Sequence, residues 1–139
     1  MSLEQLAFIT REAVPTLDAL QASVDQLGFD CKIGNAYVPL NSSGFLPCIL
    51  KGQASGFEIG FGSAAEALRD MPDLPEVVGR RETAISFRWG GSMAECACVM
   101  AVCSALARDF DAVVYYPDDE LLYSVSDLRA ETLQALNLA

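Results

Sequence analysis

The sequence contains no histidine. Histidine is the side chain whose ordinary pKa lies nearest neutrality. It supplies the base of Ser-His and Cys-His catalytic pairs and is a common metal ligand. Its absence excludes those hydrolase designs and every His-ligated metal site. The sequence therefore favours a protein that is not an enzyme, although an active site built on carboxylates alone stays open.

Positive charge is scarce. Nine Lys and Arg residues stand against 19 Asp and Glu residues, so the formal net charge is −10 at pH 7. Such a charge repels nucleic acids and anionic membranes and attracts basic proteins. We therefore expect a basic protein as the partner, and neither nucleic acid nor a membrane.

A hydrophobic run of membrane-spanning length is also missing. The longest uncharged apolar run covers residues 96–107, whereas a helix that crosses a bilayer needs about 20 residues. Near the N-terminus, Glu4, Arg11 and Glu12 interrupt the apolar residues, so no signal peptide is predicted. The five cysteines are odd in number and scattered, unlike a secreted disulfide framework. A reducing cytoplasm is the expected compartment.

The cysteines do not have the spacing of a metal site. Cys31 and Cys48 stand alone in the sequence, whereas Cys96, Cys98 and Cys103 lie on one predicted helix. Positions two apart on a helix point about 200° apart, so Cys96 and Cys98 face opposite sides. No four-ligand zinc spacing exists. We expect these cysteines to pack as small core residues, with a reactive thiol as the alternative, and we expect neither a metal nor another cofactor.

Helices are predicted from apolar spacing and capping residues. Leu17, Leu20, Val24 and Leu27 recur at helical spacing before Gly28, which predicts an amphipathic helix over 15–27. A Ser followed three residues later by Gln, Glu or Asp is typical of a helix start. This pattern predicts further helices that begin near Ser2, Ser63, Ser92 and Ser124. The helix from Ser92 to about Arg108 is apolar nearly all round, so we expect it to be buried on both sides.

Strands are predicted between these helices. The segment 83–89 alternates cleanly, and 112–116 and 120–124 flank a turn that contains Pro117. Between residues 29 and 62, three short segments rich in aromatic and β-branched residues, 36–40, 44–50 and 56–62, are separated by turn residues, with a hairpin loop over 51–56. We therefore expect one α+β domain over residues 1–139. Its mixed or antiparallel sheet has about five strands, with one buried apolar helix and flanking helices.

The C-terminal third is acidic. Between residues 109 and 131, Arg129 is the single positive charge among seven carboxylates. Tyrosines and exposed carboxylates on a hairpin tip suit recognition of a basic protein surface. A solvated turn that only aids solubility, and a divalent-cation site at residues 118–120, are the alternatives. The predicted partner-binding residues are Tyr115, Tyr116, Asp118, Asp119, Glu120 and Tyr123.

The turn between the 83–89 strand and the next helix is a second candidate site. Arg88, Gly90, Gly91 and Ser92 would offer a guanidinium and free N–H groups to an anion at a helix start. The motif is neither a P-loop nor G-x-G-x-x-G. Glu95 also brings a competing negative charge to the same turn. An ordinary turn is the simpler interpretation.

The order of elements over 84–128 is a strand, an apolar helix that ends near Asp109-Phe110, the strand "VVYYP", an acidic turn, a short strand and a helix. This order resembles compact α+β immunity proteins from bacterial toxin systems, and equally uncharacterised bacterial families. The resemblance implies a protein that binds and blocks a basic partner, such as a toxin, and it transfers no site residue. An anion- or small-molecule-binding protein and a structural homodimer remain the alternatives.

Overall fold

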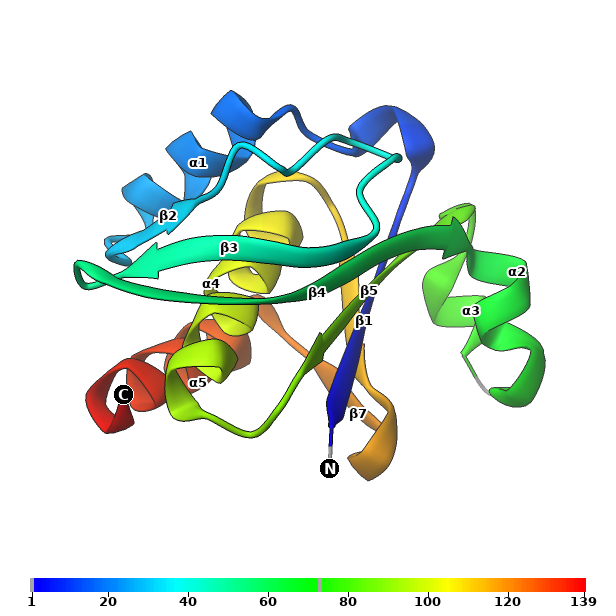
Figure 1. The fold of residues 1–139 in the computed structure, drawn as a ribbon. Coiled ribbons are helices and arrows are strands. Elements are labelled where there is room, and N and C mark those ends of the chain that lie inside the picture. Colours follow the sequence, from blue (N-terminus) through cyan, green and yellow to red (C-terminus); the bar gives the residue numbers. More distant parts are fainter. Residues whose placement is uncertain (1, 73) are drawn as a thin grey trace.

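The computed structural model describes residues 2–72 and 74–139 (Figure 1). Within them, the chain forms one β-sheet and five α-helices. The strands are β1 (Leu3–Ile9), β2 (Cys31–Ile33), β3 (Gly44–Leu50), β4 (Gln53–Ser63), β5 (Thr83–Trp89), β6 (Val113–Tyr116) and β7 (Leu121–Tyr123). The helices are α1 (Leu17–Gln26), α2 (Ala64–Ala67), α3 (Pro75–Val78), α4 (Met93–Asp109) and α5 (Val125–Leu138), with 3-10 turns η1 (Arg11–Ala13), η2 (Leu68–Asp70) and η3 (Pro117–Asp119).

The sheet is antiparallel throughout. Its strand order is β2-β3-β4-β5-β1-β6-β7, and every neighbouring pair runs antiparallel. The α+β class is therefore confirmed. Seven strands are present among the described residues where about five were expected, and one of the additional strands is β1.

The expected helix near Ser2 is wrong, because residues 3–9 form strand β1. This strand lies inside the sheet between β5 and β6. Residues 5–9 are all buried, since helices cover both faces of the sheet at this point. Ladder hydrogen bonds to two neighbours and full burial outweigh the weak preference that a capping pattern gives to a helix.

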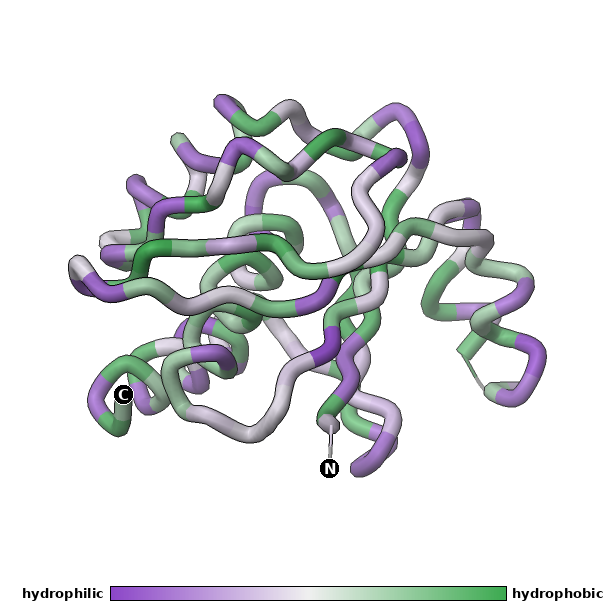
Figure 2. The backbone as a smooth tube through the Cα atoms, in the orientation of Figure 1, coloured by the Kyte–Doolittle hydropathy of each residue, from purple (hydrophilic) through white to green (hydrophobic). Residues whose placement is uncertain are grey.

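Two hydrophobic layers flank the sheet. Alternate residues of β1 separate them: Ala7 and Ile9 belong to the large core beneath α4, whereas Leu6 and Phe8 pack with α2 and α3 on the opposite face. Helix α4 contacts the sheet and also contacts α1 and α5. Figure 2 shows hydrophobic residues gathered along α4 and hydrophilic residues on the outer turns of α1. The layers therefore follow the two-residue period of the strands.

The buried apolar helix is confirmed as α4. Every residue from Ala97 to Leu106 is buried. The Ser92 hydroxyl accepts a hydrogen bond from the Glu95 N–H, as the capping pattern predicts. Many of its buried residues are Ala or Cys, which let the sheet and the neighbouring helices approach closely. Helix α4 is therefore the centre of the larger core.

The region before β4 departs from expectation. Residues 36–40 are predicted as a strand but form turns and irregular backbone. The β3–β4 hairpin turn consists of Lys51 and Gly52, both with positive φ (50° and 80°), and is therefore shorter than the expected loop over 51–56. Pro47 lies one residue outside the part of β3 that pairs with β2. Its missing N–H therefore removes no hydrogen bond from the β2–β3 pairing.

No helix among residues 2–72 and 74–139 is long and apolar enough to cross a membrane.

Candidate functional site

The acidic hairpin forms one edge of the sheet. β6 pairs with β1 on one side and with β7 on the other, and β7 is the outermost strand. Asp118 and Asp119 lie in η3 between these strands, and Glu120 follows with a left-handed backbone (φ 50°). All three side chains are exposed. The predicted turn and returning strand are therefore present, and their carboxylates face solvent.

The three tyrosines do not form one exposed surface with these carboxylates. Tyr115 is only 7% exposed and packs with the α2–α3 side of the sheet. Tyr116 and Tyr123 are half-buried against the core on the α4 side. Adjacent strand residues point to opposite faces, which divides the set. Burial raises the pKa of Tyr123 to about 12 and also raises the pKa of Tyr116, so both hydroxyls stay neutral at physiological pH.

A pocket of about 290 Å³ separates the hairpin from the segment around η2 and α3. Glu120 contributes one carboxylate and Asp70 the other. Neither takes part in an ion pair among the described residues. Apolar side chains make up most of the remaining lining, which consists of Met71, Pro72, Leu74, Tyr115 and Leu122. The pocket therefore combines apolar side chains with two carboxylates.

Sequence reasoning missed half of this pocket. Asp70, Met71 and Leu74 lie far from the hairpin in the chain, at and beyond the end of the helix that the sequence predicts to begin near Ser63. No local pattern signals that this segment folds against β6 and β7. Only the packing of α2 and α3 over Leu6 and Phe8 brings it there.

In the turn at residues 88–92, groups that were candidates for binding an anion already contact carboxylates of the protein, Glu95 and Glu4. The Gly90 N–H donates a hydrogen bond to Glu95 at 3.2 Å, and Ser92 caps the start of α4. The Arg88 guanidinium pairs with Glu4 at 2.9 Å, which raises the pKa of Arg88 further. Gly91 supplies the positive φ (102°) that the turn needs. The ordinary-turn interpretation fits these contacts.

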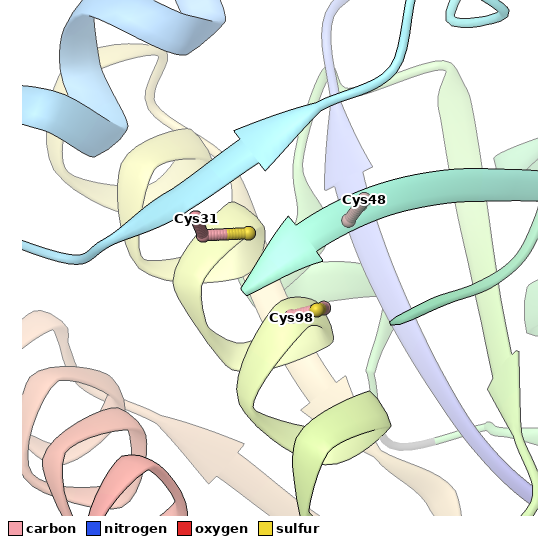
Figure 3. A group of neighbouring side chains, drawn as sticks. All are labelled: Cys31, Cys48 and Cys98. Atoms are coloured by element: carbon pink, nitrogen blue, oxygen red, sulfur yellow. The ribbon is translucent and has the colours of Figure 1, made fainter. Parts of the chain in front are cut away.

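Three cysteines far apart in the sequence meet in the core. Cys31 comes from β2, Cys48 from β3 and Cys98 from α4, and Figure 3 shows them gathered between the sheet and the helix. Their Sγ atoms all lie within 4.8 Å of one another. The sequence spacing suggested that Cys31 and Cys48 each stand alone, but in the structure both belong to this group. Cys96 points elsewhere, as expected, and is only half-buried.

The three thiols are close enough to shift one another's pKa. As neighbouring donors, Cys31 and Cys48 lower the pKa of Cys98 below its ordinary value. The same contacts, together with burial, raise the pKa of Cys31. Residues 118–120 do not bring three carboxylate oxygens comparably close. Among the described residues, the cysteine trio is the single group of this kind with metal-ligand geometry.

Comparisons with family models, with curated proteins and with solved structures give no match.

Proposed function

We propose that this protein binds and blocks a basic partner protein, as an immunity protein does with a toxin, through the hairpin of β6, η3 and β7 and the pocket beside it. The observation that carries the proposal is the pocket itself, in which Asp70 and Glu120 line the same space as apolar side chains such as Leu122. A Lys or Arg side chain has the same two parts, an aliphatic stem and a cationic head. Such a side chain would bury its stem against Leu122 and place its charge beside the carboxylates.

The surroundings of the pocket support a cationic ligand. Asp118 and Asp119 stand next to Glu120 on the exposed tip, and the whole chain carries a net charge of −10. A field of one sign speeds the approach of an oppositely charged protein. Leu121 and Leu122 on the neighbouring edge strand are exposed large apolar side chains, which suit the centre of a protein interface.

The edge strand supports the proposal in a second way. β7 is the last strand of the sheet, so its outer backbone groups have no strand beside them within the described residues. A partner segment in extended form can pair with such an edge. Edge pairing would fix the position of the partner, and the pocket would select a basic side chain on it.

The partner is identified first. The protein is used as bait in a bacterial lysate at low and at high salt, and a single basic protein lost at high salt is the expected result. Replacing Asp118, Asp119 and Glu120 by Ala should then slow association with that protein by about tenfold or more and flatten its salt dependence. Association rates are measured by surface plasmon resonance across a salt series.

The control changes the net charge equally at another place. Replacing Glu12, Asp18 and Asp30 by Ala removes three exposed carboxylates around α1, and should slow association far less. Equal slowing by both triple variants would mean that total charge, and not the hairpin, governs binding. Asp70→Asn with Glu120→Gln tests the pocket separately and should speed dissociation. Unchanged binding of the hairpin variant would refute this location for the site.

A further inference from the structure

The trio of Cys31, Cys48 and Cys98 has the donor set and spacing of a metal centre. All three thiols are free and almost completely buried, with exposures of 1%, 1% and 0%. A metal ion bonded to sulfur at about 2.3 Å requires sulfurs about 4 Å apart in a three-ligand site. The observed limit of 4.8 Å is within a small side-chain adjustment of that spacing. Three of the five cysteines therefore converge on one point.

Hydrogen-bond donors surround these sulfurs. The Gly56 N–H and the Ser55 side chain lie beside Cys98 and lower its pKa, and the Gly34 N–H, which donates to the Pro47 carbonyl oxygen at 2.8 Å, lies beside Cys48. Donors of this kind stabilise the negative charge of thiolates that ligate a metal. They also offset the negative charge that three thiolates leave around a monovalent or divalent cation.

Glycine is required for two of these donors. A Cβ on Gly56 would lie 2.4 Å from the Leu46 carbonyl oxygen, and a Cβ on Gly34 would lie 2.5 Å from the Pro47 carbonyl oxygen. Only glycine therefore allows the backbone to approach β3 this closely beside the trio. Gly56 belongs to strand β4, and the Gly34 N–H is held by its hydrogen bond to the Pro47 carbonyl oxygen, so both are oriented before any ion arrives.

A small surface pocket lies near the trio. It has a volume of about 220 Å³, and Ser55 and Ala94 are part of its wall. Ser55 lies beside Cys98, and Ala94 lies one helical turn before Cys98 on α4. The pocket therefore adjoins the part of the core that holds Cys98, although none of the three cysteines lines it.

We propose that Cys31, Cys48 and Cys98 bind one soft, thiophilic metal ion of the Cu⁺ and Zn²⁺ class. The donor set consists of sulfur only, which selects soft ions and rejects Mg²⁺ and Ca²⁺. Binding replaces thiol protons, which leave for solvent, and forms metal–sulfur bonds without any change of oxidation state. The site is independent of the acidic hairpin and of the partner proposed for it.

The test is a metal titration of the reduced protein under anaerobic conditions. Cu⁺ and Zn²⁺ are each added with a competing chelator, and bound metal is counted by elemental analysis after desalting. One equivalent of Cu⁺ or of Zn²⁺ is expected, with a rise in the unfolding temperature because the ion binds only the folded chain. The two titrations tell which ion is preferred, and Mg²⁺ should cause neither change.

Cys98→Ala and Cys31→Ala should each weaken metal binding by at least about 100-fold, since each removes a ligand. Cys103→Ala is the matched control, because Cys103 is equally buried on α4 but lies outside the trio. Near-ultraviolet circular dichroism checks that each variant is folded. Two of the three cysteines are substituted, so that the test still holds if one of the variants does not fold. Failure of both ions to bind the wild-type protein, or undiminished binding in the folded Cys98 or Cys31 variants, overturns the proposal.

Discussion

Gln5 is the residue whose environment conflicts most with its chemistry. It lies in the middle of β1 and is completely buried. Its amide nitrogen reaches the Met100 sulfur at 3.6 Å, and among the described residues its side-chain oxygen has no hydrogen-bond partner. A buried polar atom without a partner costs about 1–3 kcal/mol of stability.

Gln5→Met should therefore stabilise the protein by about 1 kcal/mol, because methionine has a similar shape and no orphaned oxygen. Gln21→Met is the matched control. The Gln21 amide bonds to the Cys31 carbonyl oxygen at 2.9 Å and accepts from the Ile33 N–H at 2.8 Å. That substitution should destabilise by a comparable amount. Urea unfolding midpoints measure both, and a destabilised Gln5→Met would show that the amide has a favourable role here.

Helix α4 is the element on which the larger core depends. It packs against the sheet on one side and against α1 and α5 on the other. A Ser104–Thr132 hydrogen bond of 3.0 Å joins it to α5, and Thr132 in turn donates to the Leu128 carbonyl oxygen. These polar groups are satisfied, so the helix pair is held both by packing and by a fixed contact.

Val102→Asp should unfold the protein, because Val102 is 2% exposed and the buried residues among those described include no Lys or Arg. An unpaired carboxylate in such a place is far less stable than in water. Leu133→Asp on α5 is the control, since Leu133 is 46% exposed and should be tolerated. Far-ultraviolet circular dichroism and thermal melts distinguish the two. A folded Val102→Asp variant would contradict the central position of α4.

The whole molecule carries an excess of negative charge that its ion pairs do not neutralise. The net charge is −10, and only three ion pairs are found among the described residues. Self-repulsion of this kind disfavours the compact state. Raising NaCl from about 10 mM to about 150 mM shortens the Debye length from about 30 Å to about 8 Å and screens it.

The unfolding temperature should therefore rise by a few degrees with NaCl over this range. The unfolding temperature of the triple variant Asp118→Asn, Asp119→Asn, Glu120→Gln should rise less with salt, because this variant has less repulsion in the acidic hairpin to be screened. Differential scanning calorimetry measures both series. An unfolding temperature that falls with salt would show that ion pairs such as Arg81–Asp111 contribute more than the repulsion does.

The sequence by itself determined the local features of this protein. The alternation of Thr83–Trp89, the apolar character of Met93–Asp109 and the capping at Ser124 each arise from neighbours within a few residues, and the structure has all three elements. The acidic tip at residues 118–120 was visible for the same reason. Periodicity and capping are short-range signals, so they survive without knowledge of the fold.

Only the tertiary structure decided which distant residues meet. It made a strand of residues 3–9, because β5 and β6 bond to both of its sides. It placed Tyr115 and Tyr116 on opposite faces and closed a pocket between Asp70 and Glu120. It also joined Cys31, Cys48 and Cys98, whose spacing gives no metal motif. Strand order and helix packing are long-range contacts, and no local pattern encodes them.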